Sequence, residues 1–204
     1  MAMNVEYTID LDHRVWIPVP LVFPWNGYAD AATWAHDLST SLMSGIDAPD
    51  EVRAALEQAA VGMADVDSPL PGALERFWHL PVEGGPERLV HLYVTETEAR
   101  TAEELAELAR AGVGGFVQTV TILEGTAFDV ALRAVVLTDL PDRRIAVLRT
   151  LGIRGGHVFV VELIEEQTAV LEELEPAVEA LFRSIRVRVE GDERPRATAQ
   201  GAWS

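Results

Sequence analysis

The sequence predicts an α+β fold, an antiparallel β-sheet flanked by helices, with a helical insertion in the N-terminal part. Between residues 88 and 189 the hydrophobic pattern reads strand, helix, four strands, helix and a short strand. The connections within the four-strand run are too short for parallel crossovers, which take a dozen or more residues, so these strands are expected to be antiparallel neighbours. A hydrophobic content of 49% in 204 residues is enough for one large core.

The chain is expected to start with a strand and to continue into a proline-rich stretch. Val5, Tyr7 and Ile9 alternate with polar residues, which is the period of a strand with one wet face. Residues 15–25 contain three prolines and two tryptophans. Proline cannot donate to a β-ladder, so this stretch is expected to be an edge strand or an irregular packed segment.

Two helices, a hairpin and a third helix are expected next. Apolar residues recur at helical spacing in the insertion between residues 30 and 65. Two short segments rich in aromatic and β-branched residues, 74–82 and 88–97, flank a Gly-Gly-Pro turn and predict a β-hairpin. Thr101 and Glu104 have the spacing of a capping box and predict a helix that ends at Gly112.

The remaining elements are four strands, an amphipathic helix and a last short strand. In the helix, Leu174, Val178 and Phe182 lie on one apolar face, and Pro176 is expected to begin a helical segment or to kink it. The predicted strands cover residues 116–123, 127–138, 143–152, 157–164 and 184–189.

The expected domain organisation is a single α+β domain over residues 1–189, with the helical insertion at residues 30–65. Residues 190–204 are polar and rich in small residues, and they are expected to form a flexible tail.

This order of elements resembles a known superfamily. The resemblance is carried by Leu-Tyr-Val-Thr at 92–95, the helix at 101–111, Gly-Gly-His-Val-Phe-Val at 155–160 and Leu-Phe-Arg-Ser-Ile-Arg-Val at 181–187. Together these make residues 88–189 similar to the PsbP/Mog-like superfamily of photosystem II PsbP, the Ran-binding Mog proteins and actinobacterial LpqN-like lipoproteins. The resemblance implies an antiparallel sheet flanked by helices, in proteins that bind other proteins without catalysis. It transfers no site residues, because the superfamily shares no catalytic motif.

The charge and composition exclude several classes of function. The chain has 33 acidic residues against 16 arginines, a formal charge of −17, and it contains neither lysine nor cysteine. This charge repels phosphate backbones and anionic lipids, so no nucleic-acid or membrane partner is expected. Schiff-base chemistry, phosphate-loop lysines and thiolate metal sites are excluded as well. We therefore predict no catalytic residue, cofactor or metal. Early charged residues and later prolines interrupt the first thirty residues, which argues against a signal-peptide core and favours a cytoplasmic location.

Two groups of residues are candidates for a site. Two histidines, His79 and His91, are expected on the two strands of the predicted hairpin, where a carboxylate such as Glu96 would complete a metal or acid–base site. The alternative is that both are ordinary strand histidines. The second group is an aromatic cluster that acts as a protein-binding anchor if it is exposed and belongs to the core if it is not. It consists of Trp16, Phe23, Trp25 and Tyr28.

The sequence favours a noncatalytic, cytoplasmic protein-interaction module, an adaptor or assembly factor with a protein partner. One alternative is a small-molecule-binding protein or an unrecognised enzyme that uses a pocket between the sheet and the helices. Another is an accessory factor or chaperone of a secretion system. The sequence leaves the partner, the pathway and the oligomeric state open.

Overall fold

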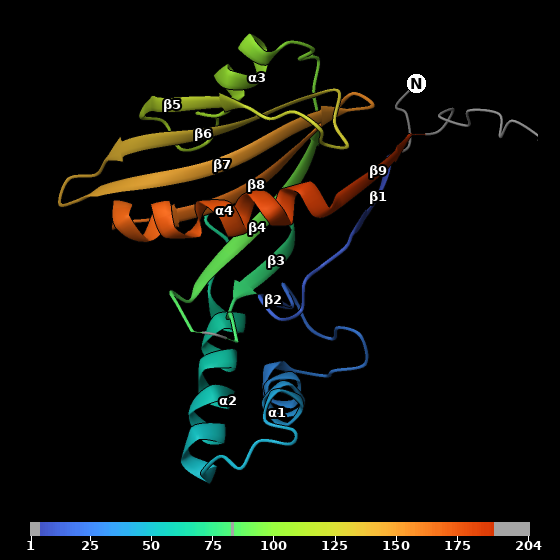
Figure 1. Cartoon of the computed structure of the whole chain (residues 1–204), viewed down its shortest axis with the longest axis vertical. Helices are drawn as coiled ribbons and strands as arrows, with labels where there is room; N and C mark the ends of the chain where they lie inside the picture. The colour runs from blue at the N-terminus through green and yellow to red at the C-terminus, as the bar shows by residue number, and fades with distance from the viewer. Residues whose placement is uncertain (1–4, 83, 190–204) are drawn as a thin grey trace, which may run out of the picture.

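The computed structural model describes residues 5–82 and 84–189, and it confirms an α+β fold in which an antiparallel sheet is flanked by helices (Figure 1). Its elements in chain order are β1 Val5–Ile9, β2 Trp16–Pro18, α1 Ala31–Leu42, α2 Asp50–Asp65, β3 Ala73–His79, β4 Arg88–Glu96, α3 Ala102–Leu108, β5 Phe116–Ile122, β6 Val130–Asp139, β7 Arg144–Arg154, β8 His157–Glu165, α4 Thr168–Ser184 and β9 Ile185–Val189.

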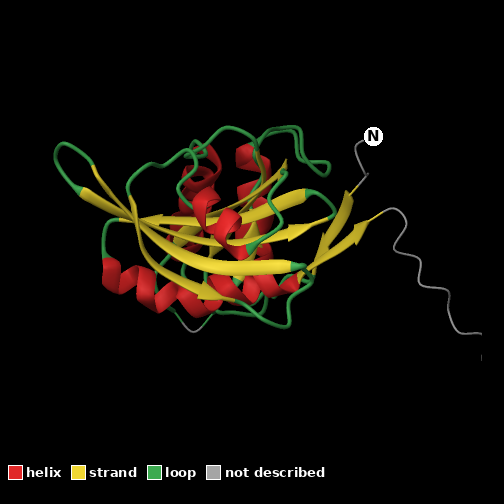
Figure 2. Ribbon diagram, turned by 90° about the horizontal axis from the view of Figure 1, so that it is seen from above, coloured by secondary structure: helices red, strands yellow, loops and turns green. Residues whose placement is uncertain are grey.

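The main sheet contains seven of the described strands in the order β2-β3-β4-β8-β7-β6-β5, and every neighbouring pair is antiparallel. Helices α4 and α3 cover opposite faces of this sheet (Figures 1 and 2). Side chains of alternate residues point to opposite faces. Leu148 on β7 therefore lies in the core beneath α4, whereas its neighbour Val147 lies in the core beneath α3.

The last helix follows the predicted amphipathic pattern. Its buried residues are Leu171, Leu174, Val178, Leu181 and Phe182, at the spacing of one helical face. Pro176 lies inside α4 instead of at its beginning, so the first of the two predicted roles for this proline is wrong.

The helical insertion packs as a separate layer at one end of the sheet. Helices α1 and α2 contact each other, and Trp34 and Ala60 share a third core with Trp78 of β3. The carboxylate of Asp30 accepts a hydrogen bond from the backbone N–H of Thr33 at 2.8 Å and so caps the start of α1. In Figure 1 this layer lies at the opposite end of the molecule from α3.

The structure also corrects some bounds and supplies pairings that the sequence left open. Helix α3 ends at Leu108 instead of continuing to Gly112, because the residues after Leu108 form turns. Strand β1 does not join the main sheet, because it pairs along its whole length with β9 in a two-stranded ribbon. Strand β6 begins at Val130 instead of residue 127, since residues 123–129 form a loop that packs Phe128 into the core beneath α4. The proposed tail, residues 190–204, lies outside the described residues.

None of the helices within residues 5–82 and 84–189 combines the length and the apolar character that crossing a lipid bilayer requires.

Candidate functional site

A row of buried charged and polar side chains crosses the main sheet on the α3 side. Arg76 on β3 stands opposite His91 on β4, His91 stands opposite Glu162 on β8, and Glu162 stands opposite Arg149 on β7. Residues that face each other in antiparallel strands point to the same side of the sheet. Each of the four is at most 4% exposed. We call these four residues the charged row.

The two arginines of the charged row hold helix ends onto the sheet. Arg149 donates hydrogen bonds to the carbonyl oxygens of Ala109 and Ala111, at 2.8 and 2.7 Å, just after α3. Arg76 donates to the carbonyl oxygen of Ala64 in the last turn of α2, at 2.9 Å. The last carbonyls of a helix have no partner within it, and a nearby cation also complements the negative end of the helix dipole. The charged row therefore fixes where both helices end.

An ion pair forms the centre of the charged row. Arg149 Nε lies 2.7 Å from Glu162 Oε2, and both side chains are enclosed. Within the described part of the chain, Glu162 Oε1 and His91 Nε2 are buried and make no hydrogen bond. Buried polar atoms without a partner cost free energy, so these two atoms lower the stability that the charged row contributes.

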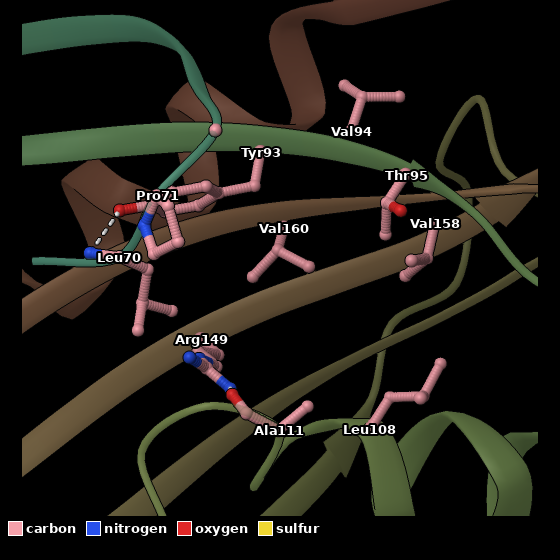
Figure 3. A pocket seen from close by; sticks show the side chains of 11 residues that line it. Leu70, Pro71, Tyr93, Val94, Thr95, Leu108, Ala111, Arg149, Val158 and Val160 are labelled. Carbon is pink, nitrogen blue, oxygen red and sulfur yellow. Dashed lines mark hydrogen bonds between the residues drawn. The ribbon is translucent and has the colours of Figure 1, made fainter. Parts of the chain in front are cut away.

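A hollow of about 360 Å³ lies beside the charged row, on the same face of the sheet (Figure 3). Its floor consists of two cross-strand pairs, Tyr93 with Val160 and Thr95 with Val158. Most of its lining is apolar. We call it the sheet hollow. It is lined by Leu70, Pro71, Gly72, Tyr93, Val94, Thr95, Leu108, Ala111, Arg149, Val158 and Val160.

The sheet hollow exists because α3 is too small to cover the sheet. An α-helix with its side chains is about 10–12 Å across, and neighbouring strands are about 4.8 Å apart, so one helix covers roughly two strands. Helix α3 packs on β6 and β7. Strands β4 and β8 are therefore left uncovered between α3 and the loop that follows α2, and they form the floor.

The two walls of the sheet hollow are attached to the floor and to each other. The backbone N–H of Leu70 donates to the Tyr93 hydroxyl at 3.4 Å, which ties the loop after α2 to β4. A Cβ placed on Gly112 would lie 3.2 Å from the Leu70 side chain, so the turn after α3 closely approaches that loop. Arg149, at the α3 side of the hollow, is engaged by Glu162 and by backbone carbonyls.

Burial controls the titration of the groups around the sheet hollow. It raises the pKa of Tyr93 to about 12, helped by the negative charge of Glu162, so the phenol stays protonated. Burial, together with the positive charge of Arg76, lowers the pKa of His91 to about 4, so this imidazole is neutral at physiological pH. Burial also raises the pKa of Glu162, while Arg149 acts in the opposite direction.

The predicted histidine pair is not formed. His79 stands opposite Arg88 in the hairpin, and Arg88 is three positions before His91 on β4. Residues three apart on a strand point to opposite faces, so the two histidines lie on opposite sides of the sheet. His79 packs edge-on against Trp16 and its Nδ1 lies 2.8 Å from the Pro86 carbonyl oxygen, as expected for a structural strand histidine. No cluster of three potential metal ligands occurs within residues 5–82 and 84–189.

The aromatic cluster joins the helical insertion to the sheet. Trp16 is 3% exposed and lies in the core, so it is not available as a binding anchor. Phe23, Trp25 and Tyr28 are half-buried and pack on the third core, where the rings of Trp25 and Tyr28 stack at 6.4 Å. All four aromatic side chains therefore pack on core residues, which agrees with the second alternative given for this cluster, that it belongs to the core.

The charged row was not predicted from the sequence, and a pocket between the sheet and the helices was considered only as part of an alternative function, without its lining residues. A signal for the charged row was present, because Arg149 and Glu162 interrupt strands that are otherwise apolar on both faces. A charged residue in such a strand is buried only if it is paired, which points to a structural or functional role. The sheet hollow left no comparable signal, since it depends on how far α3 extends over the sheet.

Comparisons with known proteins add little to the geometry. No protein-family model and no curated protein matches the chain. Among solved structures it is similar to a Pseudomonas aeruginosa protein of unknown function, PA94, described as a putative regulator. The two chains are 17% identical, with a TM-score of 0.39 over 58% of this chain and 86% of the other. A likeness at this level carries no argument, and the PsbP/Mog-like resemblance stays a prediction.

Proposed function

We propose that this protein is a noncatalytic interaction module that binds a partner protein in the sheet hollow. The observation that supports this most is the combination of an apolar lining with charged neighbours that are already engaged. Arg149 is held by Glu162 and by two backbone carbonyls, and Tyr93 is a neutral phenol. Such a site offers apolar area and shape, but no nucleophile activated by a neighbouring base.

The charge around the sheet hollow indicates the chemistry of the partner. Exposed acidic residues lie next to lining segments of the hollow in the sequence: Asp67 precedes the first wall, and Glu107 precedes Leu108 in α3. Arg110 follows α3 closely in the sequence, and its guanidinium is paired with the carboxylate of Glu107 at 2.6 Å. The fitting occupant is therefore an apolar side chain of a partner segment that carries lysine or arginine on either side.

A small-molecule ligand is the second candidate function. It is favoured by one observation, because about 360 Å³ lies within the range of roughly 300–1,000 Å³ that is typical of small-molecule sites. A secretion accessory or chaperone role differs from the first proposal only in the identity of the partner. The cytoplasmic location stays a prediction.

Filling the sheet hollow tests the proposal. Thr95 is an exposed residue of the floor of the hollow, so Thr95→Trp fills the hollow with a large side chain without disturbing the core. Thr40→Trp, at an exposed position of α1 far from the hollow, is the matched control. We expect proteins captured from the native host by the wild type and by Thr40→Trp to be lost with Thr95→Trp, while all three proteins unfold at similar temperatures.

Capture of the same proteins by all three variants would overturn the proposed site. Mass spectrometry of the purified proteins separates the two candidate functions. A small molecule that co-purifies with the wild type and with Thr40→Trp, but not with Thr95→Trp, would favour the ligand-binding function over the protein-binding one.

A further inference from the structure

The two edges of the main sheet are protected to different extents. Strand β2 has three residues, ends at Pro18 and is followed by Pro20, and short strands and prolines are common protections of a sheet edge. Strand β5 has seven residues, pairs with β6 alone among the described strands and contains neither a charge nor a proline. Its pairing with β6 is irregular between Val117 and Thr119, so the regular part of this edge begins at Thr119. An edge of this kind offers unpaired backbone groups to another strand.

Two of the three exposed apolar residues of β5, Val120 and Ile122, lie on the α3 side of the sheet, whereas the third, Phe116, stands opposite Leu137 of the core beneath α4. Val120 and Ile122 are 44% and 54% exposed. They stand opposite Ala134 and Leu132, which belong to the core beneath α3. Thr121 points to the other face, since it stands opposite Arg133, whose guanidinium binds Glu175 of α4 at 2.8 Å.

The backbone N–H and C=O groups of Val120 and Ile122 point away from β6, toward the open edge of the sheet. The N–H of Leu123 donates to the carbonyl oxygen of Ala131 on the neighbouring chain segment at 2.9 Å. In an antiparallel ladder the residues that bond to a given neighbour alternate along the strand. Thr121 therefore also bonds toward β6, whereas the N–H and C=O groups of Val120 and Ile122 face away from the sheet.

We propose that β5 pairs with β5 of a second copy of this chain, as an antiparallel strand that continues the sheet across a twofold axis. Thr121 lies on the axis, and Val120 of one copy forms a backbone-bonded pair with Ile122 of the other. This register joins the outward-facing residues of both strands, as the ladder requires. It also gathers four exposed apolar side chains on one face of the combined sheet.

The uncharged and self-complementary edge of β5 selects a second copy as the occupant, although the net charge of the chain opposes association. The chain carries −17, so two copies repel each other over most of their surfaces. Strand β5 has no charge on its seven residues, and its exposed residues Val120 and Ile122 are complementary to each other across a twofold axis. Because the overall charge opposes association, salt that screens it is expected to strengthen the dimer.

Charge substitutions at the twofold axis test the proposal. In this register residue 121 faces itself in a pair without backbone bonds, where side chains are closest. We expect the wild type to sediment at twice 22.3 kDa at micromolar concentration in 0.15 M salt. Thr121→Lys and Thr121→Glu should each bind themselves at least roughly tenfold more weakly, because like charges meet directly opposite. Mixing the two variants should restore the dimer as a heterodimer.

The controls are Thr40→Lys and Thr40→Glu, on the exposed side of α1, which should dimerise like the wild type. A wild type that stays monomeric at every concentration and salt level overturns the proposal. So does a dimer that is unaffected by both Thr121 substitutions, or one that does not return on mixing them, since these results place the contact on another surface. The dimer does not depend on the sheet hollow, and neither result bears on the proposed function.

Discussion

Arg149 and Glu162 show how a charged pair is kept in the middle of a sheet. Both side chains are enclosed, and transferring two charges out of water is costly unless their hydrogen-bonding capacity is used. Arg149 uses its capacity on one carboxylate oxygen and two helix-terminal carbonyls, but the second oxygen of Glu162 has no partner within the described residues. The pair is therefore best understood as an attachment for α3.

His91 is expected to make the stability of the protein depend on pH. Its pKa of about 4 in the folded state is below the ordinary value of 6.5, so between pH 6.5 and 4 the unfolded chain binds a proton that the folded chain excludes. Stability from this residue is therefore fully present above pH 6.5 and is lost as the pH falls toward 4. Each pH unit costs at most about 1.4 kcal/mol of the free energy of unfolding.

Urea unfolding of the wild type and of His91→Gln between pH 7 and 4.5 measures this contribution. The two charged neighbours of His91 in the row, Arg76 and Glu162, are present in both proteins, so the difference between the curves isolates the histidine. The variant should lose stability less steeply as the pH falls. Parallel curves would show that His91 titrates normally in the folded protein.

The two histidines also show the limit of the sequence at the scale of single residues. The hairpin that carries them was predicted correctly, but whether His79 and His91 share a face depends on the pairing register. A shift of one residue moves every side chain to the other face. The pattern around the turn does not determine the register to one residue, so the sequence left open both a histidine site and two ordinary strand histidines.

At the scale of elements, the local signals were the reliable ones. The capping box of Thr101 and Glu104 is present, with Glu104 Oε2 3.0 Å from the Thr101 backbone nitrogen. The helices and the hairpin follow from patterns within a few residues. The pairing of β1 with β9 joins Val5 to Val189, and no local pattern contains that contact. The extent of α3 over the sheet, which creates the sheet hollow, is of the same nonlocal kind.

Gly152 on β7 is required by the packing of the loop between β5 and β6. A Cβ at this position would lie less than 3.0 Å from the ring of Phe128, which also stacks on Phe182 at 4.6 Å. Gly152→Ala is expected to lower the free energy of unfolding by about 1–3 kcal/mol, because the ring must move within a packed core. The cost should shrink when Phe128 is also replaced by alanine, as measured by denaturant unfolding.

Gly62→Ala is the matched control for this prediction. Gly62 lies within α2 with no atom within 4 Å of an added Cβ, so alanine should stabilise the protein by up to about 1 kcal/mol. Equal effects of the two substitutions would contradict the packing explanation, and so would an unchanged cost of Gly152→Ala without the Phe128 ring.

At the scale of the whole molecule, the buried residues Arg76 and Arg149 attach the ends of α2 and α3 to the sheet. Between these two attachments an apolar hollow remains on the surface of an acidic protein. The α+β class and the antiparallel sheet followed from the sequence because short connections and strand periods specify them. The position of the hollow followed from tertiary packing alone. Binding in that hollow is the central claim.

Hydrogen–deuterium exchange of the protein alone and of the complex recovered by affinity capture tests this claim most directly. The walls of the sheet hollow, residues 66–72 and 108–115, lie outside the sheet, so we expect their backbone N–H groups to exchange faster in the free protein than those of the central strands. Binding in the hollow predicts slower exchange in both walls and no change in the exposed turns of α1. Unchanged exchange in both walls, with protection elsewhere, would contradict it.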